Sequence, residues 1–161
     1  MSSVQVLRNR TEPGLALTAQ RFGPHGRYLP LKLLAVGGMA EIYLAEDREE
    51  QRLVVVKKAS REVFSDRGLR KMFWDEARIA TAVAHPNIVR VLDTTSACDE
   101  GFYVMEFLMG VDIAALLHYE CRRDSRIPRE HALSIASFVA RALDSAHDTR
   151  AADGSRLDVV H

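Results

Sequence analysis

The sequence lacks the features that mark several common classes of protein. Only two of its 161 residues are cysteines, Cys98 and Cys121, and neither stands in a CxxC or Cys/His pattern. This argues against a structural zinc site and is typical of reduced thiols in a cytosolic protein. No apolar run approaches the ~20 residues of a membrane-spanning helix, and residues 1–8 contain no apolar segment of signal-peptide length. We therefore expect a cytoplasmic protein with no membrane segment in this chain.

The chain also has no excess of charge of either sign. It contains 22 basic and 22 acidic residues, so its formal net charge is zero. This argues against nucleic acid or a polybasic membrane surface as the main partner. Because 47% of the residues are hydrophobic, a real core is possible. We expect one ordinary domain.

A short loop of small residues is the most informative local feature. Residues 28–35 and 41–46 are two largely apolar runs, and Gly37 and Gly38 lie between them. Two such runs around a glycine-containing loop predict a β-hairpin. Glycine lets the backbone approach a ligand closely, and phosphates are the usual ligand of such loops. A plain hairpin turn is the alternative.

The segment after the hairpin excludes two other nucleotide-binding motifs. Residues 52–58 are short and β-branched, which predicts a third strand. A Rossmann fingerprint needs a helix directly after its glycine-rich turn, whereas here a strand follows. A Walker loop is excluded because no Gly-Lys-Ser/Thr follows the glycines.

The rest of the chain alternates between helical and strand patterns. Residues 1–27 contain two stretches that break periodicity, and we expect them to form a disordered tail. Apolar residues that recur at three and four predict a helix over 66–83, which ends before Pro86. The remaining predicted elements are strands at 88–92 and 102–107, a helix at 113–119 capped by Asp112, and a last helix from Pro128 to Thr149.

One carboxylate lies on the apolar stripe of the 66–83 helix. Glu76 follows Met72 by four residues and precedes Ile79 by three. A carboxylate that points into a core is costly unless it is paired, and Lys57, at the end of an apolar strand, is the candidate partner. Alternatively, Glu76 lies at the edge of the stripe and reaches water.

Seven stretches occur in a characteristic order and carry a family resemblance. They are Leu34 to Ile42, Val54-Val55-Val56-Lys57, Phe73-Trp74-Asp75-Glu76-Ala77-Arg78, His85-Pro86-Asn87-Ile88-Val89, Tyr103-Val104-Met105-Glu106-Phe107-Leu108-Met109-Gly110, Ala142-Leu143-Asp144-Ser145-Ala146-His147 and Val159-Val160-His161. Together they resemble the eukaryotic-like serine/threonine protein kinases in their bacterial form, from Tyr28 to the last residue.

The resemblance implies an α+β fold. The small lobe would occupy residues 28–109 as a five-stranded antiparallel sheet plus one helix. Residues 110–161 would contain the hinge exit and the first two helices of the large lobe, which is truncated.

The resemblance also implies an ATP site. Lys57 would hold the α- and β-phosphates and Glu76 would fix Lys57, so these two are the implied catalytic residues. The loop backbone would cover the phosphates, Ile42 and Val55 would enclose the adenine, and Met105 would be the gatekeeper. The implied cofactor-binding residues are Leu34, Val36, Gly37, Gly38, Met39, Ala40, Ile42, Val55, Lys57, Met105, Glu106, Leu108 and Asp112, the last three at the adenine edge and the ribose.

The sequence departs from the family pattern at three positions and at its end. Ala35 and Ala40 replace glycines and Val55 replaces an alanine, so we expect a stiffer loop, a narrower adenine slot and weak nucleotide binding. After His161 the family has the catalytic aspartate and the Mg²⁺ ligands, and no metal ligand is expected in this chain.

Two functions follow as expectations. In the first, an intact parent transfers the ATP γ-phosphate to serine or threonine of a protein substrate that binds through the missing large lobe, and this chain alone is inactive. The alternative is a non-catalytic nucleotide-binding or regulatory pseudokinase-like module.

Overall fold

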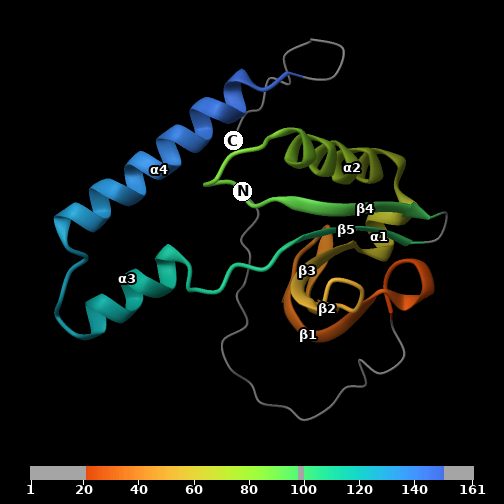
Figure 1. Cartoon of the computed structure of the whole chain (residues 1–161), viewed down its shortest axis with the longest axis horizontal. Helices are drawn as coiled ribbons and strands as arrows, with labels where there is room; N and C mark the ends of the chain where they lie inside the picture. Colours follow the sequence, from red (N-terminus) through yellow and green to blue (C-terminus); the bar gives the residue numbers. More distant parts are fainter. Residues whose placement is uncertain (1–20, 98–99, 151–161) are drawn as a thin grey trace. The chain divides into compact units, whose positions relative to one another are not determined.

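The computed structural model describes residues 21–97 and 100–150 (Figure 1). After a 3₁₀ turn at Pro24–Gly26, the elements are β1 (Tyr28–Val36), β2 (Ala40–Asp47), β3 (Arg52–Ala59), α1 (Arg61–Ser65), α2 (Arg67–Ala82), β4 (Val91–Ala97), β5 (Glu100–Glu106), α3 (Ile113–Arg122) and α4 (Arg129–Asp148). The chain divides into two compact units. The first contains the sheet with α1 and most of α2, and the second contains residues 82–88 together with α3 and α4.

The sheet of the first unit has the predicted five antiparallel strands, in the order β1-β2-β3-β5-β4. The predicted strand at 88–92 was wrong at its start, because β4 begins at Val91. The amide of Ile88 donates to the carbonyl of His85 at 3.0 Å. This turn delays the start of the strand.

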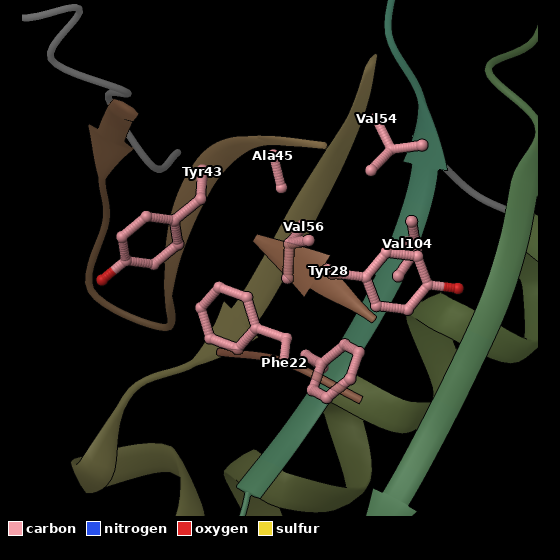
Figure 2. Packing of buried hydrophobic residues seen from close by; sticks show 8 residues of the cluster. Phe22, Tyr28, Tyr43, Ala45, Val54, Val56 and Val104 are labelled. Carbon is pink, nitrogen blue, oxygen red and sulfur yellow. The ribbon is translucent and has the colours of Figure 1, made fainter. Parts of the chain in front are cut away.

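One face of the sheet is closed by residues that the sequence placed in a disordered tail. Phe22 is 1% exposed, and its ring centroid lies 5.4 Å from that of Tyr43 (Figure 2). Gly23 and Gly26 have φ of 77° and 69°, which glycine tolerates. They allow Phe22 to fold back and exchange two backbone hydrogen bonds of 3.0 Å with Tyr28. The predicted tail is therefore wrong for residues 21–27, and residues 1–20 lie outside the described part.

The opposite face packs against α1 and α2. Its buried residues are Ala40, Ala59, Val63, Phe73, Ala77 and Tyr103. The predicted helix over 66–83 is confirmed as α2, to within one residue at each end. The expected position of Met72 on the buried stripe of this helix is wrong, since Met72 is exposed. Helix α1 was not predicted, and it begins where the Ser60 hydroxyl caps the amide of Val63.

The second unit contains the two predicted helices that follow the hinge. As expected, Asp112 caps α3 by accepting a hydrogen bond from the amide of Ala115 at 2.6 Å. An apolar groove runs along α4 and is lined by Asn87, Ile88, Ile135, Phe138, Val139, Ala142, Leu143 and Ala146. In the described part of the chain, no helix is long and apolar enough to cross a membrane. Cys98 and the stretch Val159–His161 lie outside the described residues.

Candidate functional site

Lys57 and Glu76 form the ion pair that the sequence predicted. The ammonium Nζ of Lys57, on β3, lies 2.5 Å from the carboxylate Oε1 of Glu76, on α2. The side chain of Lys57 is 18% exposed and that of Glu76 is 46% exposed. Both alternatives for Glu76 therefore hold in part, because its carboxylate is paired and also reaches water.

Tyr103, on β5, contacts both members of this pair. Its hydroxyl donates to Glu76 Oε1 at 2.8 Å, and Lys57 Nζ lies 5.5 Å from the centre of its ring. The residue is 2% exposed. Burial, followed by the negative charge of Glu76, raises the pKa of Tyr103 well above its ordinary value, so the hydroxyl keeps its proton and remains a donor.

Three predicted adenine-site residues share the sheet face of Lys57. Ile42 lies opposite Lys57 in the β2–β3 ladder, and Val55 lies opposite Met105 in the β3–β5 ladder. Directly opposed residues of antiparallel strands point to the same face, as do residues two apart on one strand. The sheet thus places Ile42, Val55 and Met105 on one face with the lysine.

The loop between β1 and β2 is closed by local hydrogen bonds. The amide of Gly37 donates to the carbonyl of Ala40 at 2.8 Å, and the amide of Ser60 donates to the carbonyl of Met39 at 3.0 Å. Ser60 directly follows β3, so this second bond ties the loop to the strand that carries Lys57.

The alanines of this loop lie in ordinary backbone conformations. In the described residues, φ is positive only at Gly23, His25, Gly26, Gln51 and Asp124. Neither Ala35 nor Ala40 adopts a positive φ, and the stiffness expected of this loop stays a prediction. Both side chains are buried.

Of the other predicted contact residues, some lie in the first unit and some in the second. Glu106, at the end of β5, accepts a hydrogen bond from the amide of Arg90 at 2.8 Å through its side chain. Leu34 is half-buried, and Val36 is exposed at the end of β1. Leu108 and Asp112 belong to the second unit, and their roles at the adenine and the ribose stay predictions. No three His, Cys, Asp or Glu residues of the described chain could jointly hold a metal ion.

A family model decides the class of this protein. Residues 28–152 match the model of the protein kinase domain. The chain belongs to the protein kinase family. Its sheet, with the Lys57–Glu76 pair, is therefore the small lobe of a kinase, and α3 and α4 begin the large lobe.

Curated bacterial kinases are similar to this one over most of its length. The tyrosine-protein kinase MasK of Myxococcus xanthus is 38% identical over 100% of this chain and 25% of its own length. The serine/threonine-protein kinase PksC of Streptomyces coelicolor is 33% identical over 76% of this chain and 23% of its own. The serine/threonine-protein kinase PknE of Mycobacterium tuberculosis is 33% identical over 86% and 23%. The chain thus spans about a quarter of the length of these relatives.

A solved structure agrees with this assignment. The kinase domain of Mycobacterium tuberculosis PknI matches with a TM-score of 0.60 and 26% sequence identity. The match covers 75% of this chain and 48% of the PknI chain.

Tyr103 is the site residue that the sequence analysis missed. The sequence did indicate that Tyr103 lies on the face of the predicted site, because it precedes Met105 by two residues and therefore shares its face of the strand. The partner of its hydroxyl could not be read from the sequence, since Glu76 lies 27 positions earlier on another element.

Proposed function

We propose that this chain is the ATP-binding part of a protein kinase whose intact form transfers the γ-phosphate of ATP to a protein hydroxyl. The observation that carries the proposal is the Lys57–Glu76 ion pair on the sheet face that also holds Ile42, Val55 and Met105. A cation beside apolar side chains suits a ligand with a polyphosphate at one end and a flat base at the other.

Each group has a distinct task in this mechanism. The ammonium of Lys57 would bind the α- and β-phosphate oxygens, and Glu76 would hold that ammonium in position between binding events. Ile42 and Val55 would pack on the adenine, and the backbone of residues 36–40 would cover the phosphates. Bound ATP with Mg²⁺ supplies the transferable phosphoryl group, and we propose that the metal ligands belong to the part of the kinase outside this chain.

The class of acceptor hydroxyl is a separate proposal. PksC and PknE are named serine/threonine kinases, which favours serine or threonine. MasK is named a tyrosine kinase and is 38% identical over this whole chain, so tyrosine is the second candidate. Phosphoamino-acid analysis of a protein phosphorylated by the full-length kinase distinguishes the two. The protein substrate and a cytoplasmic location likewise stay predictions.

The test of the proposal combines two measurements on this chain. Calorimetry should detect weak, saturable binding of ATP, whereas incubation with ATP labelled at the γ-phosphate should give no labelled protein. Binding without transfer supports the proposal. Transfer would show that the residues beyond His161 are dispensable. An absence of binding would favour the regulatory form of the alternative module over its nucleotide-binding form.

A further inference from the structure

Tyr103 joins the sheet to the helix that carries Glu76. Its ring packs against Phe73 with centroids 5.4 Å apart, and it shares a buried cluster with Ala77. Its hydroxyl donates to Glu76. Glu76 follows Phe73 by three residues and Ala77 follows it by four. Residues at these spacings share one face of a helix, so a single face of α2 is directed toward Tyr103.

The ion pair by itself is a weak anchor for the helix. Glu76 is 46% exposed, so water competes with Lys57 for its carboxylate and weakens the pair. The hydroxyl of Tyr103 comes from a residue that is 2% exposed and fixed by packing. A hydrogen bond from a fixed, buried donor to a charged group is stronger than an ion pair that water can reach, so the tyrosine is the stronger constraint on where the carboxylate lies.

The two donors also share one acceptor atom. Lys57 Nζ and Tyr103 Oη both approach Oε1 of Glu76. When a phosphate draws the ammonium away, the tyrosine would still hold that oxygen. The helix would then remain in place while the lysine changes partner.

We propose that Tyr103 is a positioning residue that keeps α2 docked on the sheet and Glu76 aimed at Lys57. The hydroxyl, rather than the ring alone, carries this role, because a residue that only filled the core would need no donor. Tyr103 does not touch the nucleotide in this proposal and acts on it through Glu76 and Lys57.

The test compares Tyr103→Phe with a matched control, Tyr28→Phe. Tyr28 is also buried, and its hydroxyl donates to the carboxylate of Asp93 at 2.6 Å, within the cluster on the opposite face of the sheet. Both variants lose one partly buried hydrogen bond from a tyrosine hydroxyl to a carboxylate, so both should lose similar overall stability. Only Tyr103→Phe should loosen the helix beside Lys57.

Two measurements separate positioning from general stability. Hydrogen exchange should be roughly fivefold to tenfold faster over residues 73–80 in Tyr103→Phe, whereas Tyr28→Phe should stay within about twofold of the parent there. ATP affinity should fall in Tyr103→Phe, and this loss should disappear when Glu76 is already replaced by alanine.

The nucleotide measurement rests on the proposed function, and the exchange measurement does not. If the parent chain fails to bind ATP, the proposed function fails, while local exchange in α2 still tests the tyrosine. Equal exchange in the two phenylalanine variants would overturn the inference. So would a loss of ATP affinity that persists unchanged in the Glu76→Ala background, because the tyrosine would then act without the carboxylate.

Discussion

Lys57 and Lys58 are neighbours in β3, and their ammonium groups point to opposite faces of the sheet. Nζ of Lys57 lies 5.5 Å from the ring centre of Tyr103, whereas Nζ of Lys58 lies 5.8 Å from that of Phe22. Tyr103 and Phe22 belong to the two separate clusters of the first unit. Side chains alternate between the two faces along a β-strand. Lys57 therefore lies on the face that packs against α1 and α2, and Lys58 lies on the face that Phe22 closes.

Gly101 should be intolerant of a side chain. A Cβ at this position would lie 2.6 Å from Phe64 and 2.9 Å from Trp74, and both rings belong to the cluster that α1 and α2 build on the sheet. We expect Gly101→Ala to cost about 1–3 kcal/mol, since a methyl group in a filled space forces these rings to move. Denaturant unfolding measures this free energy.

Gly110→Ala is the control for this substitution. A Cβ there meets nothing within 4 Å, so the variant should unfold within about 0.5 kcal/mol of the parent. If Gly101→Ala were equally mild, the close packing of Phe64 and Trp74 on β5 would be contradicted.

Asp47 should make stability depend on acid pH. Its buried carboxylate accepts two hydrogen bonds from Arg27, at 2.9 and 2.8 Å. These bonds, opposed in part by burial, hold the pKa of Asp47 below its ordinary value. Because the pKa is depressed in the folded state, the stabilisation is present above the unfolded pKa of about 3.9 and is lost as pH falls through the folded value.

The variant Asp47→Asn tests this contribution. It removes the buried anion of the pair but leaves Arg27 in contact with Glu49, whose Oε2 lies 3.1 Å from Nη1. We expect a loss of roughly 1.5–3 kcal/mol at neutral pH, the range for hydrogen bonds to a charged group. The difference from the parent should shrink as the pH is lowered below about 4 in urea unfolding experiments. A difference that stays constant over this range would show that the charge of Asp47 is not what stabilises the fold.

The apolar groove of the second unit should promote self-association of this chain. Val139 and Leu143 line it and are partly exposed. Burying such an aliphatic side chain fully is worth roughly 1.5–3 kcal/mol, which favours contact with a second apolar surface. We expect Val139→Asp to shift the chain toward monomer in sedimentation at rising concentration.

Ser137→Asp provides the matched charge on α4, because Ser137 is exposed and does not line the groove. It should associate like the parent. A parent chain that is monomeric at all concentrations would contradict the expectation that this groove mediates self-association in solution.

Most of the sheet was predictable because its signals are local. Alternating apolar residues and the glycine loop placed β1, β2 and β3 to within about two residues of the observed ends. The position of Glu76 on the helix left two alternatives open, a pair with Lys57 or contact with water, and the family resemblance favoured the pair that the structure contains.

The features that were missed depend on contacts between distant residues. Phe22 looked like part of a loop because Gly23, Pro24 and Gly26 break periodicity, and its burial arises from Tyr43 and Phe102 on other strands. Helix α1 is only five residues long, which is too short for a periodic pattern. The end of α1 is set by the extended backbone of Asp66, whose carboxylate caps the amide of Leu69.

The central claim is that the face of the sheet carrying Lys57 binds ATP, and one comparison tests it most directly. Calorimetric titration with ATP should be made on the parent chain, Lys57→Met and Lys58→Met. Methionine keeps an unbranched apolar side chain while removing the charge, so each variant loses one ammonium from one face. We expect Lys57→Met to weaken ATP binding at least about tenfold and Lys58→Met to stay within about threefold of the parent. Equal losses in the two variants, or a larger loss in Lys58→Met, would contradict the claim.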